Sequence, residues 1–256
     1  MCTLTLIAQD NAYRLAMNRD EKVARGAGIA PEIHQLDGTQ AICPGDGAGG
    51  TWIGVNECGI ALAVLNWNEP SPPVDMEFQS RGQMIPALID SRSMLELLAA
   101  SDGLDLDQVR PFRMVGIFPD QPAIRELRWN SRNLEMVTHR WESQHWFSSG
   151  LSDEQAKQVR SETCARARKD ADEGSSAWLR RLHASHDGGP AFGLCVHRGD
   201  VETLSYTEID CSPQRAVMKH SLGNPCVMKP SLSVELARLR LPLSTSAPQP
   251  ASPLAL

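Results

Sequence analysis

The sequence predicts an α+β protein with mainly antiparallel sheets, and three observations carry that prediction. Apolar runs joined by short polar turns occur at residues 4–18 and again at residues 52–65, a spacing typical of β-hairpins. Three more strand candidates follow one another within residues 112–141. Helical spacing of apolar residues appears at residues 79–100, and a polar helical pattern follows residue 152.

Length and composition favour one globular domain. The chain has 256 residues, enough for one sizeable core, and we expect the domain to cover residues 1–240. Residues 241–256 are rich in Pro and Ser, and we expect them to form a disordered tail. The formal net charge of −6 provides no positive field for nucleic acid or an anionic membrane.

The seven cysteines are scattered, odd in number and form no C-x-x-C pair. This pattern argues against a disulfide framework and a structural zinc site, and it fits a reducing compartment. The sequence shows no signal peptide and no apolar run of about 18 residues. We therefore expect a cytoplasmic protein without a membrane span, and the oligomeric state stays open.

The first hairpin organises the chain. Leu4, Leu6 and Ile7 predict a strand, the Asp-Asn pair at residues 10–11 predicts a turn, and residues 13–18 predict the returning strand. Such a hairpin brings residues 18–21 back beside Cys2. A polar cluster returning to an N-terminal thiol is the arrangement that an N-terminal nucleophile requires.

Cys2 is the first candidate for chemistry. Its side chain is small enough to permit removal of the initiator methionine, so we expect the mature chain to begin with a cysteine that carries a thiol and a free α-amine. A free thiol has a pKa of about 8.5 and an α-amine one of about 7.7–8.0, so the amine can take the thiol's proton near neutral pH. The alternative is an ordinary buried cysteine, which packs as a small hydrophobe.

The next segments are predicted from glycine and proline placement. Residues 21–40 read as a loop, because they mix Gly, charge and Pro31, which cannot lie in a central strand. Residues 45–50 match G-x-G-x-x-G, but a β-rich run follows where a dinucleotide site needs a helix. We interpret them as a turn.

Strands at residues 52–55 and 60–65 then flank a polar tip ending in Gly59, and the second is apolar on both sides, as in a central strand.

The remaining elements follow from turn residues and helix caps. Ser91 or Ser93 can cap the second part of the helical segment 79–100, and Ser152 with Gln155 makes a capping box for a helix to about residue 172. Further predicted elements are loops at 70–78 and 102–107, strands at 112–118, 124–129 and 134–141, a helix at 176–182, a hairpin of strands 191–196 and 201–209, and a short helix at 234–239.

Residues 18–21 read Asn-Arg-Asp-Glu, and with Cys2 they resemble the start of the NRDE family, also called the Transport and Golgi organisation 2 family. The resemblance continues in residues 49–55 and 59–63, at Asn66 and in residues 81–82, with a weaker echo in residues 195–198. This family is distantly similar to choloylglycine hydrolases and other N-terminal cysteine amidases. The resemblance implies a four-layer αββα sandwich of the N-terminal nucleophile (Ntn) hydrolase type, with two mainly antiparallel sheets between helices.

The resemblance also implies site residues: Cys2 as nucleophile, Asp20 to hold its amine or amide, Asn66 as an oxyanion donor, and Asn18 and Arg19 as neighbours in the motif. Residues 18 and 20 face one side of a regular strand and residues 19 and 21 the other, so all four cannot face Cys2. For Asn66 the alternative is an Asn that turns the chain at a strand end. For Arg19 the alternative is an ion pair with Glu21.

Three positions depart from the pattern of the relatives. Ser149 stands where the family tends to carry an asparagine, Ala191 lies near the place of an arginine, and Met17 stands where choloylglycine enzymes show an arginine. A basic partner for the thiolate then has to come from elsewhere, and Arg19 is a candidate. These departures weigh against a catalytic role.

Two functions of different classes follow. The first is an amidohydrolase that cleaves a small amide through Cys2 and requires no cofactor. The second, implied by the family's link to haem mobilisation and lipid homeostasis, is a non-catalytic carrier with haem or an acyl lipid as cargo. The histidines at positions 139, 145, 183, 186, 197 and 220 show no recognised ligand spacing, so we predict no metal site from the sequence.

Overall fold

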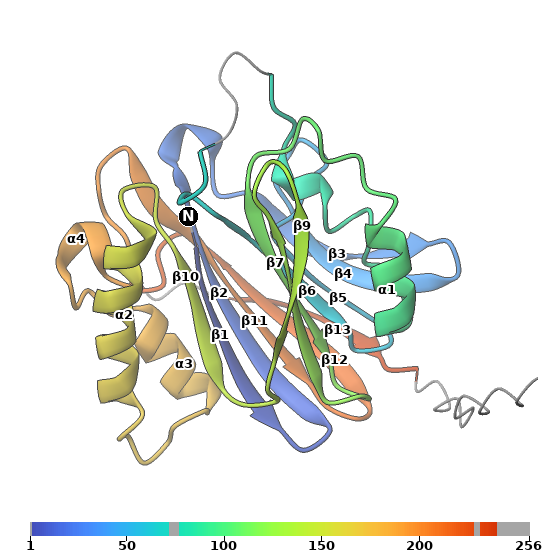
Figure 1. The fold of residues 1–256 in the computed structure, drawn as a ribbon. Coiled ribbons are helices and arrows are strands. Elements are labelled where there is room, and N and C mark those ends of the chain that lie inside the picture. The colour runs from blue at the N-terminus through green and yellow to red at the C-terminus, as the bar shows by residue number, and fades with distance from the viewer. Residues whose placement is uncertain (1, 72–76, 228–230, 240–256) are drawn as a thin grey trace, which may run out of the picture.

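The computed structural model describes residues 2–71, 77–227 and 231–239. Two antiparallel sheets face each other across the main core (Figure 1). The first sheet has the strand order β10-β1-β2-β11-β12-β13 and the second has the order β3-β4-β5-β6-β7-β8-β9. The predicted tail at residues 241–256, and residues 72–76 of the predicted loop 70–78, lie outside the described residues.

The strands of the first sheet are β1 (Cys2–Gln9), β2 (Ala12–Lys22), β10 (Gln144–Ser148), β11 (Val201–Cys211), β12 (Arg215–Leu222) and β13 (Leu232–Ala237). Those of the second are β3 (Ile29–Leu36), β4 (Thr39–Gly45), β5 (Ile53–Asn56), β6 (Ala61–Asn66), β7 (Phe112–Phe118), β8 (Ala123–Trp129) and β9 (Leu134–His139). The helices are α1 (Met94–Ser101), α2 (Asp153–Ala167), α3 (Ser176–His183) and α4 (Gly189–Phe192), with 3-10 turns η1 (Val23–Arg25) and η2 (Arg81–Gln83).

Helices cover the outer faces of both sheets. Figure 1 shows α2, α3 and α4 on the outer side of the first sheet and α1 beyond the second. The predicted four-layer αββα sandwich is therefore confirmed. None of the helices in the described segments is long and apolar enough to cross a membrane.

The β1–β2 hairpin forms as predicted, with its turn at residues 10–11 and Asn11 at φ 54°. The alternation of strand side chains divides its residues between two cores. Leu4, Leu15 and Met17 belong to the core between the sheets, whereas Ile7 and Ala16 pack under the helices. The register places Cys2 opposite Arg19, so these two side chains share one face of the sheet.

β6 is the central strand of the second sheet, as its apolar run predicts. All of its residues are buried except Asn66, which is half-buried at its end. The preceding tip is closed by Gly59, whose φ of +76° suits a residue without a Cβ. The predicted strands at 112–118, 124–129 and 134–141 form β7, β8 and β9 in the same sheet.

Several predicted elements are wrong. Residues 29–36 form β3 instead of a loop; it is an edge strand, where Pro31 is tolerated because one side of the strand has no partner. Within residues 79–100 only α1 is an α-helix, capped by Ser93. The predicted strand 191–196 begins as α4, with an isolated bridge at His197. The predicted helix at 234–239 is β13, and β10 and β12 were not predicted.

Candidate active site at the start of β1

A cavity of about 330 Å³ opens at the end of the sandwich where β1 begins. Its walls come from both sheets and from the segment after residue 77. The lining residues are Cys2, Arg19, Asp20, Glu21, Arg25, Asp46, Thr51, Trp52, Val64, Asn66, Phe78, Gln79, Ser80, Arg81, Gly82 and Arg110. The first hairpin and the end of β6 thus meet at one cavity, which we name the Cys2 cavity.

Cys2 is buried with strands on both sides, opposite Arg19 of β2 and Ser148 of β10. Its backbone nitrogen donates to Ser148 Oγ at 2.9 Å. Burial raises the pKa of its thiol, and a hydrogen bond from the backbone N–H of Asp20 offsets part of this rise. The nitrogen that would become the α-amine after loss of Met1 therefore already has an oxygen partner.

Asp20 is buried on the adjacent strand and has partners on the helical side of the sheet. Its Oδ1 accepts a hydrogen bond from Thr203 Oγ1 at 2.6 Å, and its Oδ2 lies 3.6 Å from Arg160 Nη2. Burial raises the pKa of this carboxyl group, whereas the positive charge of Arg160 opposes the rise. Asp20 is also one of the residues that line the Cys2 cavity.

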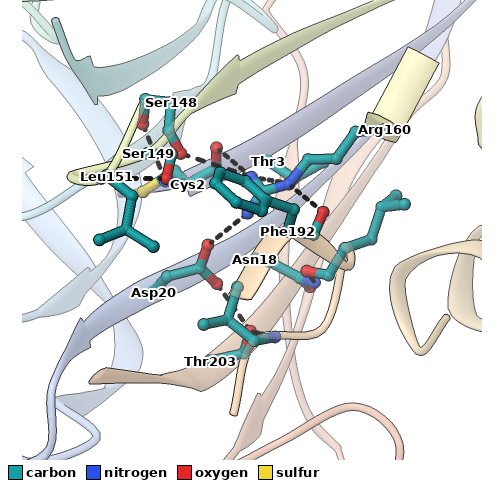
Figure 2. A network of polar contacts seen from close by, with 12 residues as sticks. Cys2, Thr3, Asn18, Asp20, Ser148, Ser149, Leu151, Arg160, Phe192 and Thr203 are labelled. Carbon is teal, nitrogen blue, oxygen red and sulfur yellow. Dashed lines mark hydrogen bonds and ion pairs between the residues drawn. The ribbon is translucent and has the colours of Figure 1, made fainter. Parts of the chain in front are cut away.

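Arg160 of α2 was not identified from the sequence. Its fully buried guanidinium donates through Nη1 to Thr3 Oγ1 at 2.9 Å, to the Cys2 carbonyl at 3.3 Å and to the Ser148 carbonyl at 3.4 Å. Figure 2 shows Arg160 reaching from the helix toward Cys2, Thr3 and Asp20. One arginine thus connects the first residues of β1, the end of β10 and Asp20. An arginine in a polar helix carries no sequence signal that it is buried.

Arg19 lies on the same face as Cys2 and packs over Trp52, with 4.5 Å from its Cζ to the ring centroid. It donates to the Gly26 carbonyl at 3.0 Å. Its charge lowers the pKa of the Cys2 thiol, although by less than burial raises it. Glu21 pairs with Arg25 at 3.0 Å, and among the described residues no ion pair joins Glu21 to Arg19.

Asn66 and Asn18 occupy different environments. Asn66 lines the Cys2 cavity from the second sheet, and its side-chain amide makes no hydrogen bond within the described part of the chain. Asn18 instead lies under the helices, where its Nδ2 donates to the carbonyls of His183 and Leu194 at 2.9 and 2.8 Å. The structure therefore brings Cys2, Arg19, Asp20 and Asn66 to one cavity and directs Asn18 away from it.

The structure also locates the three residues that depart from the family pattern. Ser149 helps to form the turn before α2, where its backbone N–H donates to Asp153 Oδ1 at 2.6 Å. Met17 is fully buried between the sheets, and Ala191 belongs to α4. Positive charge near Asp20 comes from Arg160, and the charge of Arg198 also lowers the carboxyl pKa.

The cavity has more cationic than anionic groups available for a ligand. Arg25 bridges Glu21 and Asp46 at 3.0 and 3.5 Å. Within the described ranges, Arg19, Arg81 and Arg110 form no ion pair. Burial lowers the pKa of Arg81 to about 10, and the nearby charge of Arg110 contributes to this decrease.

Comparison with known proteins agrees with this architecture. The family model described as Transport and Golgi organisation 2 matches residues 1–186. No curated protein sequence matches the chain significantly.

Two solved structures of Ntn hydrolases are similar in fold. Penicillin V acylase from Agrobacterium tumefaciens has 14% sequence identity and a TM-score of 0.51, with 88% of this chain and 84% of the acylase covered. A mutant of conjugated bile acid hydrolase from Clostridium perfringens has 9% identity and a TM-score of 0.52, with 92% of each chain covered. At these identities the likeness shows an Ntn-hydrolase-like fold.

Proposed function

The chain belongs to the Transport and Golgi organisation 2 family, and on that premise we propose that it hydrolyses a C–N amide bond of a small molecule through Cys2 after Met1 is removed. The observation that carries the proposal is the meeting of Cys2, Asp20 and Asn66 at the Cys2 cavity. A thiol and an oxyanion donor approach the same space from opposite sheets. An amide carbonyl held between them has a nucleophile on one side and a donor on the other.

In the first half of the reaction, the Cys2 sulfur forms a bond to the carbonyl carbon while its proton passes to the Cys2 α-amine. The carbonyl π electrons move to oxygen, and the oxyanion accepts a hydrogen bond from Asn66 Nδ2. Donors of this kind contribute about 3–4 kcal/mol to transition-state stabilisation. The tetrahedral intermediate then breaks its C–N bond, and the leaving amine takes the proton from the α-ammonium. A thioester on Cys2 remains.

In the second half, water attacks the thioester carbonyl and gives its proton to the α-amine. The C–S bond breaks, the acid leaves, and the sulfur recovers its proton. Ser148 Oγ, 2.9 Å from the Cys2 nitrogen, fixes the direction of the amine throughout. A positive charge on that nitrogen lowers the pKa of the thiol, which opposes the effect of burial on Cys2.

The charges of the cavity favour an anionic substrate. Arg19, Arg81 and Arg110 line it without an acidic partner in the described segments. A carboxylate or phosphate group on the substrate would supply the missing negative charge, and arginine binds such groups in a bidentate manner. We therefore propose an amide that carries a carboxylate or phosphate group.

The test joins mass spectrometry with active-site labelling. We expect the intact mass of the purified protein to lack Met1, and an electrophilic amide analogue with a carboxylate to label Cys2. Cys2→Ala should lose labelling and hydrolysis, whereas the control Cys43→Ala, which changes a buried thiol on another strand, should keep both. Retention of Met1, or equal labelling of Cys2→Ala, would refute the hydrolase proposal.

A carrier function has one observation in its favour. A second cavity of about 320 Å³ lies along β3 and β4 and has several apolar lining residues, including Ile29, Leu36 and Ile89. An acyl chain or haem would be the cargo, and the Cys2 thiol would not turn over. Haem titration followed by absorbance, and displacement of a fluorescent fatty acid, test this alternative. Binding unchanged by Cys2→Ala, with no hydrolysis by the wild type, would favour the carrier.

A further inference from the structure

Four side chains outside the Cys2 cavity converge near α4. They are His186, Cys195, His197 and Cys226, and their ligand atoms all lie within 4.8 Å of one another. His197 Nε2 is 3.4 Å from Cys195 Sγ and 3.3 Å from Cys226 Sγ. The His186 and His197 rings meet edge to face, with centroids 5.0 Å apart.

These separations fit a tetrahedral metal centre. With zinc–sulfur and zinc–nitrogen bonds of about 2.3 and 2.0–2.1 Å, a tetrahedron places a thiolate sulfur about 3.6 Å from an imidazole nitrogen. The two observed sulfur–nitrogen distances, 3.3 and 3.4 Å, are close to this value. A donor set of two sulfurs and two nitrogens in tetrahedral geometry is typical of zinc.

The surroundings supply the remaining features of such a site. Asn224 Nδ2 lies 3.0 Å from His197 Nδ1, so an amide partner orients the ring and leaves Nε2 toward the two sulfurs. O and N of an amide are assigned from their contacts, and in the flipped Asn224 the Oδ1 atom would accept a hydrogen bond from His197 Nδ1–H, which leaves Nε2 unprotonated for the metal. Cys195 is buried and His186 is exposed, so an ion can enter from the His186 side.

We propose that His186, Cys195, His197 and Cys226 bind one structural zinc ion with two thiolates and two imidazoles. Burial raises the pKa of the Cys195 thiol to about 12, and a coordinated cation removes that obstacle because it stabilises the thiolate directly. Binding releases the two thiol protons to solvent, and no electron is transferred. Sequence spacing does not predict this site, because Cys226 reaches it from another part of the chain.

A zinc ion at the proposed site would restrict the motion of the irregular segment 193–198, which lies beside Asp20. Val196 N donates to Thr203 Oγ1 at 2.9 Å, and that hydroxyl donates to Asp20 Oδ1 at 2.6 Å. Asn18 holds the same segment through the Leu194 carbonyl. Cys195 N also bonds to the Ser185 carbonyl at 3.0 Å. Zinc would therefore stabilise the wall behind Asp20 without touching the Cys2 cavity.

The primary test measures metal in the full chain purified under reducing conditions. We expect about one zinc per chain by elemental analysis, and cobalt substitution should give the visible bands of a tetrahedral ion with a thiolate charge-transfer band. Cys226→Ser and His186→Asn should each weaken zinc binding at least about 100-fold, and Asn224→Ala about 10- to 100-fold. Cys43→Ser should bind zinc as the wild type does.

Affinity should also increase with pH, because two thiol protons leave when zinc binds. An octahedral cobalt spectrum, or zinc affinity unchanged in Cys226→Ser, would overturn the proposal. A metal-free wild type with a Cys195–Cys226 disulfide under the same reducing conditions would overturn it as well. The cobalt spectrum of the wild type decides the matter even when a variant does not fold.

Discussion

Arg160 Nη2 and Asp20 Oδ2 lie 3.6 Å apart, and both side chains are fully buried. The pair forms where α2 packs on the first sheet, behind the residue proposed as the nucleophile. A buried pair contributes little net stability relative to apolar residues of the same shape, but loss of one partner leaves an uncompensated charge. Its position matters to the site because Arg160 also binds the Cys2 carbonyl at 3.3 Å.

Arg160→Met should therefore lower the free energy of unfolding by about 3–5 kcal/mol, because Asp20 and several carbonyl acceptors lose their donor. Urea unfolding of the purified variant measures this change. Asp20→Asn with Arg160→Met should cost less than the two single changes together. The control Arg166→Met, on the exposed part of the same helix, should unfold as the wild type does. Equal stability of Arg160→Met and Arg166→Met would contradict the prediction.

Stability should fall in acid because buried histidine is neutral in the folded protein. Burial lowers the pKa of His183 from 6.5 to about 3, so the unfolded chain binds a proton that the folded chain does not. Stability then decreases as pH falls from 6.5 toward about 3. Each pKa unit corresponds to about 1.4 kcal/mol, so His183 contributes on the order of a few kcal/mol.

His183→Gln should reduce this pH dependence, as measured by urea unfolding between pH 7 and pH 4. His145 and His220, whose pKa values burial lowers to about 4, contribute in the same direction in both proteins. Gln keeps a polar group near Thr5, whose Oγ1 lies 3.0 Å from His183 Nε2, and has no proton to gain. Asp20 has a raised pKa, so its protonation favours the folded state as pH falls. This contribution is the same in variant and wild type, and it cancels when their unfolding free energies are subtracted. An identical slope for variant and wild type would exclude His183 as the source.

Gly59→Ala should destabilise the fold more than Gly199→Ala does. Both glycines have positive φ, +76° and +85°, so both changes strain the backbone by about 1–2 kcal/mol. A Cβ at Gly59 would also lie 2.5 Å from Arg238 Nε and 3.0 Å from Cys211 Sγ, whereas nothing lies within 4 Å at Gly199. Thermal unfolding of the two variants separates strain from collision. Similar melting temperatures would contradict the predicted collision.

Arg81→Ala should raise KM for an anionic amide about tenfold or more, because a charge-assisted hydrogen bond contributes about 1.5–3 kcal/mol. KM for the matching neutral amide should change little. Arg132→Ala, in the turn between β8 and β9, is the control for loss of a surface charge. Steady-state kinetics with both substrates measures the effect. Equal changes in KM for the two substrates would show that Arg81 does not select an anion.

The local parts of the fold were predictable because short-range signals specify them. The turn at residues 10–11, Gly59 and the caps at Ser93 and Ser152 each act on neighbours in sequence, and each lies where predicted. The strands at the edges were harder to recognise. The short apolar run of β13 fits both the helical and the strand periodicity, so the sequence alone predicts a helix there.

The candidate site was predictable only in part, for the same reason. Cys2 and Asp20 are brought together by one hairpin, so strand pairing of residues close in sequence places them. Arg160 approaches from a helix 158 residues beyond Cys2, and no local pattern indicates that it is buried. The motif predicts a role for Asn18 in the site, but the strand register directs its amide to carbonyls under the helices.

The position of β1 in its sheet has a consequence for biosynthesis. β1 lies between β2, which follows it at once, and β10, which ends at residue 148. At about 5–20 residues per second, the ribosome completes β10 about 7–30 s after residue 2. An aminopeptidase therefore meets β1 paired with β2 alone early in synthesis, and β1 paired with both β2 and β10 later. If the hydrolase proposal holds, the fraction of active enzyme is set during translation. A chain that folds before losing Met1 keeps a peptide bond at the Cys2 nitrogen and lacks the catalytic α-amine.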